Sequence, residues 1–140
     1  FEDFRVVVVR GTNNIEDLRT DFDATPVNYN ERQVHIGFAT YAQYIAAEFF
    51  ASFEQEKKPV IFTGHSMGGA VAEVAGMPLI LAGKNATVIT FGAPQAFMAK
   101  PEELTPEMES KIIHFYSRND PVPYLLNELL DKLLGKKAKL

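Results

Sequence analysis

The sequence predicts an α/β fold in which a mostly parallel central sheet is covered by helices. Three observations carry this prediction. Apolar runs of strand length alternate with segments whose apolar residues recur at helical spacing. The run at 4–9 is apolar except for Arg5, which is typical of a strand buried on both faces of a parallel sheet. A Gly-x-Ser-x-Gly turn at 64–68 joins an apolar run directly to a helix rich in small residues.

The remaining elements follow the same alternation along the chain. After the strand at 4–9 we expect a helix at 38–53, a strand at 60–63, a helix at 67–81, a strand at 86–91, a short helix near 102–110 and a strand at 111–117. In such a fold, ligands bind beyond the carboxyl ends of the strands. A last segment, 124–134, carries leucines on one face. Core packing explains these leucines, and a helix lying on a membrane surface is the alternative.

Composition limits the classes of function. With 140 residues, 46% hydrophobic and 23% charged, the chain can bury one core, and we expect 1–140 to be a single domain that is incomplete at both ends. The net charge of −4 and the lack of a long basic run argue against a nucleic-acid partner. The absence of cysteine excludes disulfides and thiolate metal sites. Since the sequence shows neither a membrane span nor a signal-peptide pattern, we expect a soluble chain. The sequence does not determine its cellular compartment.

Ser66 is the candidate nucleophile. It lies between the strand at 60–63 and the helix at 67–81, where a sharp turn would hold it in strained geometry. Gly64 and Gly68 remove side chains that would clash where strand, turn and helix approach each other. We expect the Oγ atom to be exposed above the sheet. The alternative is a glycine-rich turn with an ordinary N-cap serine.

A serine hydroxyl needs a base, a carboxylate that orients the base, and donors for the developing oxyanion. Asp120 is the candidate carboxylate, because it follows the strand at 111–117 in a loop stiffened by two prolines. The weaker candidates are Asp17, Asp21 and Glu73, whose charges solvent would explain.

The oxyanion hole is expected to use the backbone N–H of Met67, the residue after the nucleophile, and a donor from the loop after an earlier strand. The loop at 10–12 is that segment, and Thr12 could offer both its N–H and its hydroxyl. The alternative role for Thr12 is the N-cap of a following short helix.

Five blocks of this sequence carry a family resemblance. They are Val7-Val8-Val9-Arg10-Gly11-Thr12, Val34-His35-Ile36-Gly37-Phe38, Thr63-Gly64-His65-Ser66-Met67-Gly68-Gly69-Ala70, Thr90-Phe91-Gly92-Ala93-Pro94 and Asn119-Asp120-Pro121-Val122-Pro123. In this order the blocks resemble the class 3 lipases, the fungal-lipase-like branch of the α/β-hydrolases. The resemblance implies an α/β-hydrolase fold, with Ser66 as nucleophile, Asp120 as triad acid, and Thr12 with Met67 as the oxyanion hole.

The resemblance also implies a lid after Thr12, in which Ile15, Leu18 and Phe22 would face the site and bind substrate. The family usually has a tryptophan at the position of Leu18, and charged residues surround Leu18 in this chain. A plain solvated helix is therefore an equal alternative for this segment.

The general base has no clear candidate in the sequence. In the α/β-hydrolases the histidine follows the acid, but no histidine follows Asp120 in these 140 residues. The three histidines present, His35, His65 and His114, each have a structural explanation. We therefore expect the base to lie outside this sequence.

These observations favour a serine carboxylic-ester hydrolase that acts on acylglycerols or related lipid esters through an acyl-enzyme on Ser66. We expect a small lipid or ester substrate, a lipid–water interface as a further partner, and neither a metal nor a cofactor. The resemblance is compatible with secretion. The alternative is a catalytically dead hydrolase-like module that binds an acyl chain or a protein partner.

Overall fold

A parallel sheet organises the chain. In a computed structural model that describes residues 3–12, 25–53 and 57–124, four strands pair in the order β1-β4-β5-β6. They are β1 (Arg5–Val9), β4 (Val60–His65), β5 (Ala86–Phe91) and β6 (Ile112–Phe115). Since every pair is parallel, all four carboxyl ends lie at one edge of the sheet. The predicted α/β architecture is confirmed.

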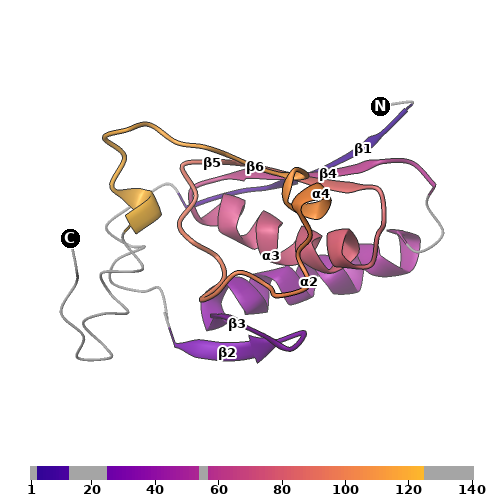
Figure 1. Ribbon diagram of the computed structural model, residues 1–140, viewed down its shortest axis with the longest axis horizontal. Helices are drawn as coiled ribbons and strands as arrows, with labels where there is room; N and C mark the ends of the chain where they lie inside the picture. Colours follow the sequence, from indigo (N-terminus) through magenta and orange to yellow (C-terminus); the bar gives the residue numbers. More distant parts are fainter. Residues whose placement is uncertain (1–2, 13–24, 54–56, 125–140) are drawn as a thin grey trace.

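Two long helices lie on one side of this sheet. Helix α3 (Met67–Leu81) packs against β4 and β5, and α2 (Ile36–Phe53) packs against α3 (Figure 1). Small residues bring α3 close to the strands. A Cβ on Gly76 would stand 2.7 Å from Val88 Cγ2 and 3.0 Å from Phe62 Cδ2. These two side chains are fully buried, so the core lies between α3 and the sheet.

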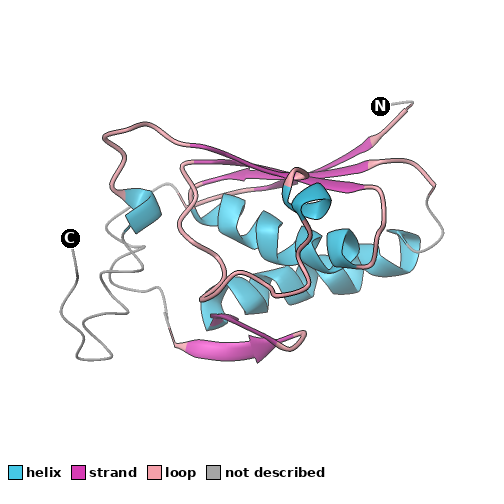
Figure 2. Ribbon diagram, in the orientation of Figure 1, coloured by secondary structure: helices cyan, strands magenta, loops and turns pink. Residues whose placement is uncertain are grey.

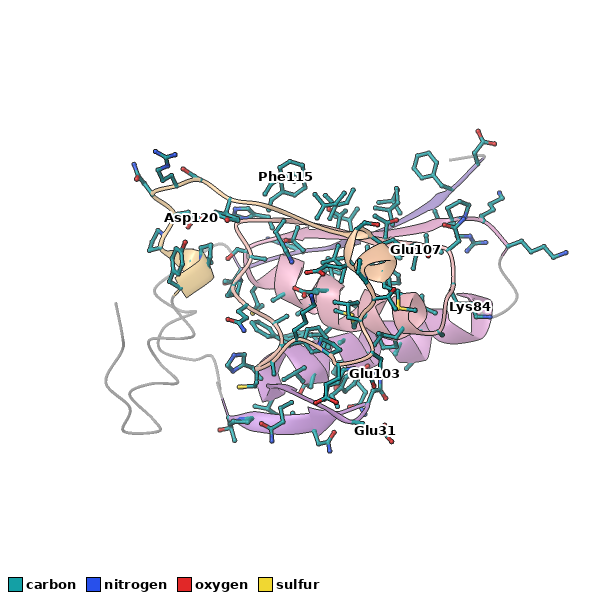
Figure 3. All side chains as sticks on the ribbon, viewed as in Figure 1. Glu31, Lys84, Glu103, Glu107, Phe115 and Asp120 are labelled. Atoms are coloured by element: carbon teal, nitrogen blue, oxygen red, sulfur yellow. The ribbon has the colours of Figure 1, made fainter. Side chains whose placement is uncertain are left out.

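The other face of the sheet carries exposed apolar side chains. Val8, Phe91 and Phe115 lie on this face, and the last two stack with ring centroids 5.4 Å apart. Figure 3 shows Phe115 on the side away from α2 and α3. The expectation that the first strand is buried on both faces is wrong for the described residues, because Val8 is 73% exposed. Strand β1 is an edge strand, and no described helix covers its outer face.

A hairpin that the sequence analysis missed precedes α2. Strands β2 (Pro26–Tyr29) and β3 (Arg32–His35) pair antiparallel around Asn30 and Glu31, both of which have positive φ. The hairpin joins the core through Val34, which is fully buried and bridges to Phe97. Figure 2 shows the hairpin beyond α2, on the side away from the sheet.

The observed boundaries differ modestly from the expected ones. Helix α2 begins at Ile36, directly after β3, and α4 (Pro106–Glu109) is shorter than the expected helix at 102–110. The side chain of Thr105 accepts a hydrogen bond from the Met108 N–H and caps α4. Most of the leucine-bearing segment at 124–134 lies outside the described residues. In the part of the chain that is described, no helix combines the length and hydropathy that crossing a bilayer requires.

Candidate active site

Ser66 occupies a strained turn between β4 and α3. Its backbone has φ 54° and ψ −130°, a conformation that residues with a Cβ atom rarely adopt. The Ser66 N–H donates to the Phe91 carbonyl at 2.9 Å, and its carbonyl accepts from the Gly69 N–H at 2.9 Å. Although Ser66 stands at the N-cap position of α3, its side chain makes no capping hydrogen bond. An ordinary N-cap serine is therefore not what the structure contains.

The side chain of Ser66 is buried rather than exposed, which corrects the expectation from sequence. Ser66 is 3% exposed, and its Oγ has no hydrogen-bond partner among the described residues. The reason is the tight packing around the turn. A Cβ on Gly69 would stand 2.7 Å from the Ala93 Cβ, so the first turn of α3 lies directly against the loop after β5. A buried hydroxyl with no partner retains its full hydrogen-bonding capacity for a reacting group.

The loop after β1 lies against the same turn. A Cβ on Gly68 would overlap the Val9 carbonyl and stand 2.7 Å from the Gly11 nitrogen, and a Cβ on Gly11 would overlap the His65 carbonyl. Only glycine permits these approaches of backbone to backbone. The contacts bring the segment that carries Thr12 to the turn that carries Met67, and both side chains are half-buried.

Asp120 lies at the carboxyl end of the sheet, in the loop after β6 (Figure 3). Its Oδ1 accepts a hydrogen bond from the Val122 N–H at 3.0 Å, which fixes the carboxylate within its own turn. A Cβ on Gly92 would stand 2.7 Å from Asp120 Oδ2 and 3.7 Å from His65 Nε2. Since His65 precedes Ser66 directly, the acid lies beside the turn that holds the serine.

The three histidines have different surroundings. His35 is buried, and its ring lies edge-on to Phe38 at a centroid distance of 5.5 Å. The Nδ1 atom of His114 is 2.7 Å from Thr90 Oγ1, and burial lowers the pKa of this imidazole. His65 is exposed, and its Nε2 atom lies 3.7 Å from the Cβ position of Gly92, which Asp120 Oδ2 also approaches. The contacts of His35 with Phe38 and of His114 with Thr90 are those of structural histidines.

Several sequence-predicted residues cannot be placed. The candidate lid residues Ile15, Leu18 and Phe22, and the weaker acids Asp17 and Asp21, lie outside the described residues.

Glu73 corrects the sequence analysis, which assigned its charge to solvent. It is half-buried in α3, lines a cavity of about 380 Å³, and burial raises its pKa to about 7. The sequence did contain a signal, because Glu73 is the one charged residue in the otherwise apolar 67–81 helix.

Comparison with known proteins gives a consistent result. A sequence model of the family described as Lipase (class 3) matches residues 6–129. The chain is 34% identical to the lipase of Rhizopus niveus over 104 residues, covering 64% of this chain and 26% of that protein. It is 31% identical over 136 residues to the secreted mono- and diacylglycerol lipase 1 of Fusarium solani, covering 86% of this chain and 38% of that protein.

Solved structures show the same relationship. Lipase II from Rhizopus niveus superposes with a TM-score of 0.65 at 27% identity, over 85% of this chain and 51% of that one. The fold is therefore that of the α/β-hydrolases. The chain spans about a quarter to two fifths of the length of the two curated relatives named above.

Proposed function

Since this chain belongs to the class 3 lipase family, we propose that the protein containing it is a serine carboxylic-ester hydrolase acting on acylglycerols or related lipid esters. The observation that carries the proposal is the strained backbone of Ser66 together with its unpartnered hydroxyl. Its backbone is strained at φ 54°, and its buried Oγ makes neither a capping bond nor any other hydrogen bond to the described residues.

In the proposed reaction Ser66 Oγ attacks the carbonyl carbon of the ester. Its proton passes to a general base, and collapse of the tetrahedral intermediate expels the alcohol, which takes up that proton. The acyl-enzyme is then hydrolysed by water through the same steps. Splitting the hydrolysis into two steps lowers the barrier of each.

The N–H of Met67 and the N–H and hydroxyl of Thr12 are proposed to bind the oxyanion. The close packing of Gly11 and Gly68 supports this assignment, because it holds the two donor segments together. Fixed donors stabilise the developing charge without reorganisation, and loss of one donor costs roughly a hundredfold to a thousandfold in turnover.

Asp120 is proposed to orient the base. The Val122 N–H holds its Oδ1, which leaves Oδ2 free for an imidazole N–H. In α/β-hydrolases the triad residues follow the chain order Ser, acid, His. The base is therefore proposed to be a histidine after Asp120 and not His35, His65 or His114, all of which precede it.

A lipid substrate is supported by the relatives, since the Fusarium solani protein is named a mono- and diacylglycerol lipase. The residues Ile15, Leu18 and Phe22 are proposed as the lid that contacts the acyl chain at a lipid–water interface. The serine triad requires neither metal nor cofactor.

The test is covalent labelling of the full-length protein with a fluorophosphonate, read by intact mass. We expect stoichiometric labelling of the wild type, and none of Ser66→Ala. Ser110→Ala is the matched control, because Ser110 is exposed and its Oγ only donates to the Glu107 carbonyl at 2.6 Å. A wild type that stays unlabelled would favour the alternative, a hydrolase-like module that binds acyl chains without turnover.

A further inference from the structure

A cavity lies between α3, β6 and the loop that follows β5. Its volume is about 380 Å³, within the range of small-molecule sites, and Ser66 is not among its lining residues. One wall is β6, with Ile112 and His114, followed by Tyr116 just after the strand. Another wall is α3, with Glu73 and Met77. The loop that joins β5 to α4 covers it with apolar side chains such as Phe97.

Two carboxyl groups line this cavity, those of Glu73 and Glu109, and Glu73 is the one on α3. It projects from α3 one turn before Met77, which also lines the cavity, and no described residue forms a hydrogen bond or ion pair with it. Burial raises its pKa to about 7, so Glu73 is mostly protonated well below pH 7 and mostly ionised well above it. A carboxyl group in an apolar cavity costs folding free energy unless a partner compensates it.

The other polar side chains that line the cavity leave Glu73 available for a cation. Among them, the Gln95 amide donates to the Phe97 carbonyl at 2.8 Å. The Nδ1 atom of His114 is 2.7 Å from Thr90 Oγ1, which leaves Nε2 as its remaining hydrogen-bonding atom, and partial burial lowers the pKa of this ring. Tyr116 contributes a phenol. Two further lining residues, Lys100 and Glu109, form an ion pair with each other, with the ammonium nitrogen 2.6 Å from a carboxylate oxygen.

We propose that this cavity binds a primary ammonium ion carrying a short alkyl chain, with the Glu73 carboxylate as its counter-ion. The ammonium group offers three N–H donors, which the Glu73 carboxylate and other acceptors of the cavity lining can accept. The apolar lining takes the alkyl chain. A metal ion fits less well, because no group of three or more His, Cys, Asp or Glu side chains gathers here or elsewhere in the described ranges. An anion also fits less well, because the ionised Glu73 carboxylate would repel it.

The test is calorimetric titration of the full-length protein with n-hexylammonium chloride at pH 6 and pH 8, beside 1-hexanol and hexanoate. We expect hexylammonium to bind about tenfold more tightly at pH 8, since binding requires ionised Glu73. The hexanol affinity should not change with pH, and hexanoate should not bind. If hexanol binds as tightly as hexylammonium at pH 8, the proposal is overturned.

Two methionines report where the ligand binds. In protein labelled with ¹³C at the methionine methyl groups, hexylammonium should shift the resonance of Met77, in the cavity, and not that of Met67, beside Ser66. A shift at Met67 alone would place the ligand in the ester site and refute the cavity site.

Variants complete the test. Glu73→Gln should abolish the pH dependence and weaken hexylammonium binding at least tenfold, whereas Glu107→Gln, an exposed change on α4 outside the cavity lining, should do neither (Figure 3). Unchanged binding by Glu73→Gln contradicts the proposal. If that variant does not fold, the Glu73 carboxyl ¹³C signal in the wild type decides, because bound ammonium must lower the Glu73 pKa.

Discussion

The backbone nitrogen of Gly11 lies 2.7 Å from the point where a Cβ on Gly68 would stand. This contact joins the loop after β1 to the first turn of α3, two segments that are far apart in the sequence. It holds together the neighbours of Thr12 and Met67, the two proposed donors to the oxyanion. Activity should therefore be more sensitive than folding to small changes at Gly68.

Gly68→Ala should separate the two donor segments. Its Cβ meets backbone atoms of Val9 and Gly11, which cannot rotate away as a side chain can, so the loop must shift. We expect a loss of kcat/KM of roughly a hundredfold, the cost of removing one oxyanion donor. We also expect a loss of about 1 to 3 kcal/mol in the free energy of unfolding. Ester hydrolysis and urea denaturation measure the two effects.

Gly83→Ala is the matched control for this prediction. Gly83 has φ 71° and no atom within 4 Å of its Cβ position, so alanine there adds backbone strain without a clash. It should lower the free energy of unfolding by about 1 kcal/mol and leave kcat/KM unchanged. Equal activity losses in the two variants would contradict the role given to the Gly68 contact.

Gly92→Ala should displace the Asp120 carboxylate. The added Cβ would stand 2.7 Å from Asp120 Oδ2. A misplaced carboxylate orients the base poorly, and we expect kcat/KM to fall roughly ten- to a hundredfold. The effect should nearly vanish in an Asp120→Asn background, because the group that is displaced no longer works as the triad acid. A double-mutant cycle on ester hydrolysis measures this coupling, and additive losses would show that Gly92 acts elsewhere.

The sequence predicted the elements whose pattern depends on local spacing. The glycines around Ser66 and the small residues of α3 indicated a close strand–turn–helix packing, which the structure contains. The hairpin before α2 was missed because its strands have four residues each, and its turn places Asn30 and Glu31 at φ 49° and 64°. Glutamate at positive φ is rare, so the usual Asn-Gly signature of such a turn was absent.

Burial was harder to predict because it depends on which elements lie on each face. The apolar first strand was expected to have two buried faces, yet it lies at an edge with Val8 exposed. The charge of Glu73 predicted a solvated position, yet Glu73 is half-buried and lines the cavity between α3, β6 and the loop after β5. Neither result follows from the composition of the segment itself.

The strain at Ser66 gives a stability prediction. Its φ of 54° and ψ of −130° suit glycine, which has no Cβ to clash with the backbone. Ser66→Gly should therefore be more stable to urea than Ser66→Ala by about 1 kcal/mol, while both lack the nucleophile. If Ser66→Ala is the more stable variant, the turn is not strained in solution.

Ionisation of Glu73 should make folding weaker as pH rises. Its pKa is raised from 4.5 in the unfolded chain to about 7 in the fold, so between these values the folded state retains a proton that the unfolded chain has lost. The stability contribution is therefore full below pH 4.5 and is lost as pH rises through about 7, by roughly 3 kcal/mol in total.

Glu73→Gln removes this titration and keeps the shape of the side chain. The free energy of unfolding of the variant, relative to wild type, should rise with pH from 5 to 7 and then level off. His114 titrates with the opposite sign, because its pKa is lowered on folding, but it is present in both proteins and cancels in the difference. Urea denaturation at pH 5, 6, 7 and 8 gives this difference, with the exposed Glu107→Gln as control. A difference that does not change with pH would mean that Glu73 is hydrated in the folded protein.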